Sequence, residues 1–104
     1  MGGELLYIFA SPFVSRKRLA EELDISTSTV DTIVKELKAE EGKRYKKDTT
    51  SIKTGSMIRI NYLAFIDYFT YRDRLKEKNL RKGVPEYNPK HWAEQMGWYA
   101  TKAV

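Results

Sequence analysis

Apolar residues recur at helical spacing in two stretches between residues 15 and 40. The members of the two stretches are Leu19, Ala20 and Leu23, and then Val30, Ile33, Val34 and Leu37. A spacing of three and four residues places such side chains on one face of a helix. Ser15 and Ser26 stand just before the two stretches, where a hydroxyl accepts a hydrogen bond from an amide of the first helical turn. Because residues 24–26 are the whole connection, the pattern predicts a helix-turn-helix, and Gly42 is expected to cap its second helix.

A shorter apolar stretch precedes this pair at residues 4–10. Its pattern fits a short helix or a buried strand, and we favour the helix, which Pro12 would terminate. Phe13 and Val14 are then expected to pack at the entry to the next helix. All of these residues are interpreted as core material.

A β-hairpin is predicted within residues 43–61, where polar and apolar positions alternate. Gly55 follows a threonine between two such runs, and glycine supplies the positive φ that hairpin turns use. Ile58 and Ile60 fall on one face of the second strand and are expected to pack. An earlier strand near residues 44–47 is an alternative pairing partner, which leaves the register of the hairpin open.

A long helix is predicted after Asn61, which is a suitable N-cap, with its end between residues 79 and 83. Its apolar stripe is expected to comprise Tyr62, Phe65, Ile66, Phe69 and Leu75. The residues expected at its sides are Tyr68, Tyr71, Arg72 and Arg74. Interleaved rings and cations also form platforms for single-stranded nucleic acid, but core packing or an interface explains the rings without a ligand.

The C-terminal part is expected to form a separate helical tail, so we divide the chain into a domain at residues 1–82 and a tail at residues 83–104. Asn88 followed by Pro89 predicts the start of a short helix. The large side chains of this tail are His91, Trp92, Met96, Trp98 and Tyr99. A solvated end does not need so much apolar surface, so we expect a homodimer contact, with docking on the same chain as the close alternative and disorder as the third.

Composition limits the class of protein. The 104 residues with 41% hydrophobic content are enough for one small domain. The absence of cysteine excludes disulfides and thiolate zinc sites and suits a cytoplasmic location. No apolar stretch approaches the roughly 18 residues of a membrane span, and the first residues do not resemble a signal peptide. His91 is the single histidine, and no HExxH, phosphate-binding glycine loop or serine-nucleophile elbow occurs. We therefore expect no enzyme activity, cofactor, metal or small-molecule ligand.

The net charge of +5 is unevenly distributed. Residues 1–42 carry five basic and eight acidic side chains, residues 43–83 carry twelve and four, and residues 84–104 carry two of each. This distribution is expected where one element attracts phosphates and another reads bases. The alternative is a lysine-rich surface that is simply solvated.

Residues 19–37, LAEELDISTSTVDTIVKEL, resemble the helix-turn-helix of bacterial winged-helix regulators. The positions that carry the resemblance are Leu19, Ala20, Ile25, Ser26, Ser28, Thr29, Val30, Ile33 and Leu37. Asp24 departs from the pattern, since many relatives have glycine there, although aspartate tolerates the left-handed turn conformation better than most residues. The order of predicted elements over about residues 13–69 is also similar to that of the small excisionases of mobile elements.

The resemblance implies an α+β, mainly α fold: a winged helix-turn-helix with a three-helix core, a β-hairpin wing and a C-terminal helical extension. It also implies that the second helix of the pair enters the major groove of double-stranded DNA. The expected base-contacting residues are Thr27, Ser28, Asp31, Thr32 and Lys35. The expected backbone-contacting residues are Ser15, Arg16, Lys17, Lys43, Arg44, Lys46, Lys47, Lys53 and Arg59.

Two features of charge have alternative explanations. Asp31 is an acid on a face that approaches a polyanion, and it either accepts from cytosine N4 or repels phosphate. Arg16, Lys17 and Arg18 lie at the positive end of a helix dipole, where they either meet a phosphate or are simply solvated.

The leading functional prediction is a sequence-specific double-stranded DNA-binding protein, a bacterial, phage or plasmid transcription regulator. An excisionase-like or replication accessory protein of a mobile element is the alternative within the same class. A protein-interaction adaptor, which uses the long helix and the aromatic tail, is the alternative from a different class.

Overall fold

The computed structural model describes residues 13–96 of the chain. The elements in chain order are β1 (Phe13–Val14), α1 (Arg16–Leu23), α2 (Thr27–Ala39), β2 (Ser51–Thr54), β3 (Met57–Asn61), α3 (Tyr62–Lys76), α4 (Lys78–Arg81) and α5 (Pro89–Met96). The fold is α+β and mainly helical, as predicted, with one small antiparallel sheet. The helix expected at residues 4–10 and the tail residues Trp98 and Tyr99 lie outside the described residues.

The two helices predicted between residues 15 and 40 are α1 and α2, and a serine caps each of them. Ser15 Oγ accepts a hydrogen bond from the amide of Arg18 at 3.1 Å, and Ser26 Oγ accepts one from the amide of Thr29 at 3.1 Å. These amides have no partner within the first helical turn. Asp24 ends α1 in the left-handed conformation, with φ 54° and ψ 49°, and turns the chain towards α2. Both predicted helix starts are confirmed.

The buried faces of α1 and α2 meet β3 and α3 in one core. The large apolar side chains without any exposure are Leu19, Val30, Ile33, Leu37, Ile60 and Phe65. Burial of an aliphatic or phenylalanine side chain contributes about 1.5–3 kcal/mol. The helix pair, the sheet and α3 therefore stabilise one another as a single unit.

The strands are arranged in the order β1-β3-β2, with β3 in the centre. Thr54 pairs with Met57, so a two-residue turn begins at Gly55, whose φ of 61° is the positive value that such a turn needs. Ile60 is buried and Ile58 half-buried, as predicted for one packed strand face. The hairpin register, which the sequence left open, follows from this turn.

The third strand is not the one that the sequence indicated. Phe13 and Val14 pair with Asn61 and Ile60 of β3, and Val14 is buried. We expected these two residues only to pack at the entry to the next helix and considered residues 44–47 as the additional strand. A strand of two residues has no periodic pattern, so only its pairing with β3 reveals it.

Residues 41–50 form a loop that is held by side chains. The cap of α2 is Glu40, so the prediction that Gly42 caps this helix is wrong by two residues. Gly42 instead opens a turn, with φ 84° and its amide donating to the carbonyl oxygen of Tyr45 at 2.7 Å. Tyr45 is 2% exposed, and residues 44–47 form turns and an isolated bridge but no strand, so the alternative pairing partner considered for the hairpin is wrong.

Asn61 begins α3 as predicted, with Oδ1 accepting from the amide of Ala64 at 3.1 Å. The helix ends at Lys76, earlier than predicted, because Glu77 is extended with φ −99° and ψ 115°. The short α4 follows this break. The single long helix of the sequence interpretation is therefore two helices.

The buried face of α3 also differs from the predicted stripe. Its buried residues are Leu63, Ala64, Phe65, Asp67, Tyr68 and Leu75. Phe69 was expected in the core and is 39% exposed, whereas Tyr68 was expected at the side and is 3% exposed. α3 packs against α2 and β3 and also against α5, so one helical stripe does not describe its burial.

α5 begins as predicted, with Asn88 Oδ1 accepting from the amides of Lys90 at 3.1 Å and His91 at 3.3 Å. The helix packs on α3, where the rings of Trp92 and Tyr71 meet edge to face with centroids 6.3 Å apart. The described part of the tail therefore docks on its own chain, which was the second of the three alternatives. The homodimer contact stays a prediction.

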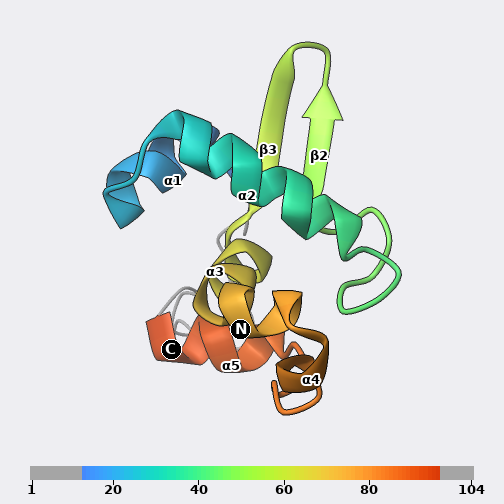
Figure 1. Cartoon of the computed structure of the whole chain (residues 1–104). Helices are drawn as coiled ribbons and strands as arrows, with labels where there is room; N and C mark the ends of the chain where they lie inside the picture. Colours follow the sequence, from blue (N-terminus) through green and yellow to red (C-terminus); the bar gives the residue numbers. More distant parts are fainter. Residues whose placement is uncertain (1–12, 97–104) are drawn as a thin grey trace, which may run out of the picture.

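Figure 1 shows how these elements are placed relative to α2. The β2–β3 hairpin projects beyond α2 on one side, and α3, α4 and α5 gather on the other side. No helix within residues 13–96 combines the length and the apolar character needed to cross a membrane. The hairpin thus extends away from the docked tail.

Candidate nucleic-acid interface

One exposed side of α2 carries all five residues predicted to contact bases. Thr27, Asp31 and Lys35 follow one another at four-residue spacing, Ser28 and Thr32 lie beside them, and all five are exposed. The apolar residues of α2 point the other way, into the core. We call this solvent-facing surface the α2 face.

The hydroxyl groups of the α2 face differ in their availability. Ser28 Oγ lies 3.1 Å from Ser26 Oγ, and Thr32 Oγ1 donates to the carbonyl oxygen of Ser28 at 3.1 Å. Thr32 therefore offers its methyl group and oxygen lone pairs, but its proton is engaged. The Thr27 hydroxyl has no partner among the described residues and is free to donate or accept.

Asp31 is paired with Arg16, so its negative charge is compensated on the α2 face. Arg16 Nε donates to Oδ1 of Asp31 at 2.9 Å, and Nη2 donates to Oδ2 at 2.7 Å. These hydrogen bonds lower the pKa of Asp31 and raise the pKa of Arg16. The cation at the start of α1 and the acid on α2, for which the sequence left separate alternative explanations open, are thus two halves of one contact.

Glu36 points from α2 towards α3, where basic residues surround it. Arg72 donates two hydrogen bonds of 2.7 Å to its carboxylate, Lys76 Nζ donates one of 3.2 Å, and the Tyr68 hydroxyl donates one of 3.0 Å. The bonds from Arg72 are the main cause that lowers the pKa of Glu36 to about 2. Burial and the bond to Glu36 raise the pKa of Tyr68.

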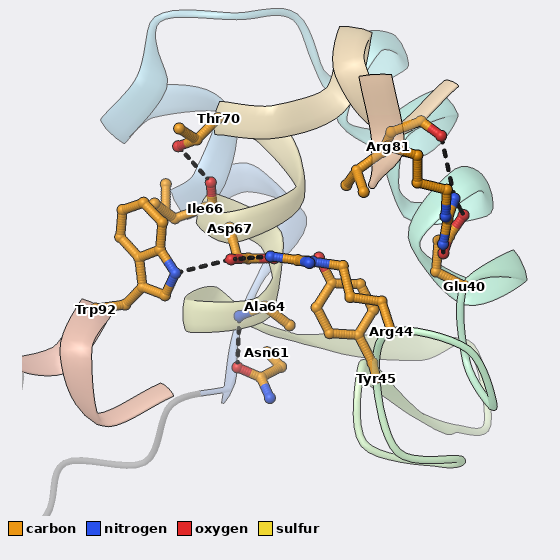
Figure 2. A network of polar contacts seen from close by, with 11 residues as sticks. Glu40, Arg44, Tyr45, Asn61, Ala64, Ile66, Asp67, Thr70, Arg81 and Trp92 are labelled. Atoms are coloured by element: carbon orange, nitrogen blue, oxygen red, sulfur yellow. Dashed lines mark hydrogen bonds and ion pairs between the residues drawn. The ribbon is translucent and has the colours of Figure 1, made fainter. Parts of the chain in front are cut away.

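The acids at the end of α2 are also paired. Both carboxylate oxygens of Glu40 accept from Arg81, one of them from Nη1 at 2.9 Å (Figure 2). Glu41 accepts from the amide of Thr50 at 3.1 Å and lies 3.3 Å from Nζ of Lys38. Every acid from residue 27 to residue 41 therefore has a basic partner, while Lys35 on the α2 face has no ion pair within residues 13–96.

A groove of about 340 Å³ lies between α2 and the hairpin. Its residues are the apolar Val34, Ile58 and Ile60, the basic Lys35, Lys38 and Lys53, and Asp31 and Ser51. The α2 face therefore borders the hairpin directly. Lys53 is opposite Ile58 and faces this groove, whereas Arg59 is opposite Ile52 on the outer side of the hairpin.

Most cations predicted to contact the DNA backbone are exposed and have no ion pair among residues 13–96. These residues are Lys17, Lys43, Lys46, Lys47, Lys53 and Arg59. The first of them is on α1, the next three are on the loop after α2, and the last two are on opposite faces of the hairpin. Ser15, also predicted here, uses its hydroxyl oxygen to cap α1.

Arg44 is placed away from this surface. Its Nε donates to Oδ2 of Asp67 at 2.7 Å and its Nη2 to Oδ1 at 3.0 Å, and its side chain is 8% exposed. We predicted Arg44 to contact the DNA backbone, but the edge of its guanidinium formed by Nε and Nη2 is occupied by the buried Asp67. Arg44 is therefore excluded from the candidate interface.

Asp67 is the centre of a buried polar network that was not predicted from the sequence. It also accepts from the Tyr45 hydroxyl at 2.6 Å and from Nε1 of Trp92 at 2.9 Å (Figure 2). Burial and the contact with Asp67 raise the pKa of Tyr45. The available signal was a lone acid within the apolar and aromatic residues 62–69. This network joins the loop after α2 to α3 and α5.

Within the described residues no three His, Cys, Asp or Glu side chains are grouped so that they could hold a metal ion. Comparison of the chain with protein-family models, with curated proteins and with solved structures finds no match. The charge and geometry of α2 and the hairpin are therefore the basis for a functional inference.

Proposed function

We propose that this chain is a sequence-specific double-stranded DNA-binding protein, a transcription regulator with a winged helix-turn-helix domain. α2 enters the major groove, and the β2–β3 hairpin acts as the wing. The observation that carries the proposal is the distribution of charge on α2. Asp31 and Glu36 of α2 are paired with basic residues of α1 and α3, and Glu40 and Glu41, just after α2, are paired with α4 and with a lysine of α2 itself. Lys35, on the exposed side of α2, has no ion pair among residues 13–96.

The dimensions and chemistry of α2 support this docking. A helix with its side chains is about 10–12 Å across, and the major groove is about 12 Å wide. Thr27, Ser28 and Thr32 are short, exposed and able to reach base edges or a thymine methyl group. The order of two helices followed by a hairpin is compatible with the arrangement that the sequence resemblance implies, in which the first core helix would fall on residues outside the described ones.

The unpaired cations supply the contacts to phosphates. Lys35 and Lys53 line the groove between α2 and the hairpin, Lys17 lies at the start of α1, and Arg59 lies on the outer hairpin face. Each neutralised phosphate releases counterions, so 6–10 contacts would lower the affinity about 10³- to 10⁵-fold between about 50 and 200 mM salt. Strong salt dependence is therefore expected.

A salt titration with a random-sequence duplex tests the proposal. Lys53→Ala should reduce the slope of log affinity against log salt concentration by about 1, because one phosphate contact is lost. Lys78→Ala is the charge-matched control, since α4 lies on the other side of α2 from the hairpin (Figure 1). The proposal fails if the wild-type protein does not bind the duplex at low salt, or if the two variants change the slope equally.

A protein-interaction adaptor is the second candidate, and the outer face of the hairpin is the observation that favours it. Ile52 and Met57 are 45% and 56% exposed there, beside Arg59. Exposed apolar residues of this kind occur at protein contacts. The same titration separates the candidates, since an adaptor has no reason to bind a random duplex.

Within the DNA-binding class, a regulator and an excisionase-like or replication accessory protein differ in how far they bend the duplex. The electrophoretic mobility of the complex on duplexes that carry the site at different positions measures this bend, and a strong bend would favour the accessory protein.

Homodimer formation, which we also propose, is tested by sedimentation equilibrium. Trp92 already packs on α3, so the dimer contact would use other surface.

A further inference from the structure

We propose that Arg16 and Asp31 act as one base-reading unit, in which Arg16 donates to the acceptors of a guanine and Asp31 holds it in position. The inference rests on the proposed DNA binding and identifies the residues that select one base pair. It changes two roles that were expected from the sequence. Arg16 moves from the DNA backbone to a base, and Asp31 becomes a positioning residue.

The ion pair leaves one edge of the Arg16 guanidinium free. A guanidinium has five N–H donors, and Asp31 accepts from Nε and from one N–H of Nη2. The second N–H of Nη2 and both of Nη1 have no acceptor among the described residues. Two parallel donors on this edge match O6 and N7 of guanine, an acceptor pair that is exposed in the major groove.

Asp31 determines where this edge lies. Arg16 belongs to α1, but Asp31 is one turn from both Thr27 and Lys35 on the α2 face. The contact therefore brings a cation of α1 onto the surface proposed to meet the bases. It also compensates the acid that would otherwise repel phosphates there.

A purely structural role explains this pair less well. The side chains of Arg16 and Asp31 are 45% and 55% exposed, and exposed ion pairs contribute little to stability because water and salt screen them. Fixing a long arginine side chain also costs conformational entropy. Because the side chain of Arg16 is already ordered in the free protein, less conformational entropy is lost on binding, which is the advantage of a preorganised contact.

Selection of preferred duplexes from random sequence, followed by binding to single-base variants of the selected site, tests the inference. The wild-type protein should select G·C at one position, and Arg16→Ala should reduce that preference at least about 10-fold, as expected for loss of a bidentate contact. Asp31→Ala should reduce the preference for G·C at the same position severalfold. The double variant should be as unselective as Arg16→Ala alone, because both residues act through one contact.

Lys17→Ala is the matched control, since Lys17 is the next residue of α1, is exposed and has no ion pair in the described part of the chain. It should weaken binding to all duplexes about equally. Arg16→Lys keeps the charge but lacks the planar fork, so it should bind random duplex as the wild type does while losing the G·C preference. Circular dichroism melting establishes that each variant is folded before it is compared.

Three results would overturn the inference. Asp31→Ala could tighten binding to every duplex equally, which would mean that Asp31 only repels phosphates. Arg16→Ala could weaken every duplex equally, as Lys17→Ala does, which would mean that Arg16 contacts a phosphate. The two variants could relax different positions, which would mean that Asp31 reads a base of its own. All three differ from failure of the proposed function, in which the wild-type protein binds no duplex at low salt.

Discussion

Asp67→Asn is expected to destabilise the protein strongly, because Asp67 is the acceptor for three side chains at once. It is 1% exposed and receives hydrogen bonds from Arg44 at 2.7 and 3.0 Å, from Tyr45 at 2.6 Å and from Trp92 at 2.9 Å. Asparagine preserves the shape but replaces an acceptor oxygen with a donor and removes the charge. Arg44, at 8% exposure, would then be a buried cation without a counter-charge.

The magnitude follows from the burial of this pair. Removing one partner of a buried ion pair costs about 3–5 kcal/mol, because the remaining charge is desolvated without compensation. Native proteins of this size are stable by about 5–15 kcal/mol. The substitution should therefore remove a large fraction of the free energy of unfolding and lower Tm by at least about 12 °C.

Urea unfolding followed by circular dichroism measures the effect. Tyr45→Phe is the control, since it removes one hydrogen bond to the carboxylate but leaves the Arg44–Asp67 pair, and it should cost about 1.5–3 kcal/mol. Arg44→Met in the Asp67→Asn background should recover part of the loss, because the unpaired charge is removed with it.

The reasoning would be refuted if Asp67→Asn lowered the free energy of unfolding by less than about 1 kcal/mol, since a solvent-exposed ion pair contributes no more than that. It would also be refuted if Arg44→Met brought no recovery in the double variant. Either result would mean that packing alone, and not the carboxylate of Asp67, holds the loop and α5 against α3.

Two further predictions concern α2. The pKa of Glu36, lowered to about 2 from an ordinary value of 4.5, means that its ionised form stabilises the fold above about pH 4.5 and that this contribution is lost as the pH falls towards 2. The free energy of unfolding from urea titrations should therefore fall between pH 4.5 and 2, with no more than about 3 kcal/mol of the fall due to this group. Glu36→Gln should show a shallower dependence of stability on pH, and a pH dependence equal to that of the wild type would contradict the contact with Arg72. Ser26→Ala should cost about 1 kcal/mol in the same assay through loss of the cap on the Thr29 amide, whereas Ser56→Ala in the exposed hairpin turn should cost almost nothing, and equal effects would argue against the cap.

The starts of the helices could be predicted because the contacts that define them are local. Ser15, Ser26, Asn61 and Asn88 each accept from an amide two or three residues ahead, so the sequence contains both partners within one turn. Gly55 marks the hairpin for the same reason, since its positive φ is a property of the turn itself. Of these four caps, none depends on a distant element.

The errors occur where distant residues compete for the same segment. Residues 44–47 have strand-like alternation, but Asp67, 23 residues after Arg44, binds both Arg44 and Tyr45 and draws them inward. Tyr68 was assigned to the side of α3, but it is buried because α2 offers Glu36 as an acceptor 32 residues away. Periodicity within one helix contains no information about such partners.

For the candidate site, the sequence by itself determined which residues share the exposed side of α2, because helical spacing places Thr27, Asp31 and Lys35 on one face. Only the tertiary structure decided which charges remain available there. Arg16 meets Asp31 across 15 residues, and Arg72 meets Glu36 across 36. The charge that a surface presents depends on which acids and bases the fold brings within hydrogen-bonding distance, and that is a property of packing between elements and not of any one of them.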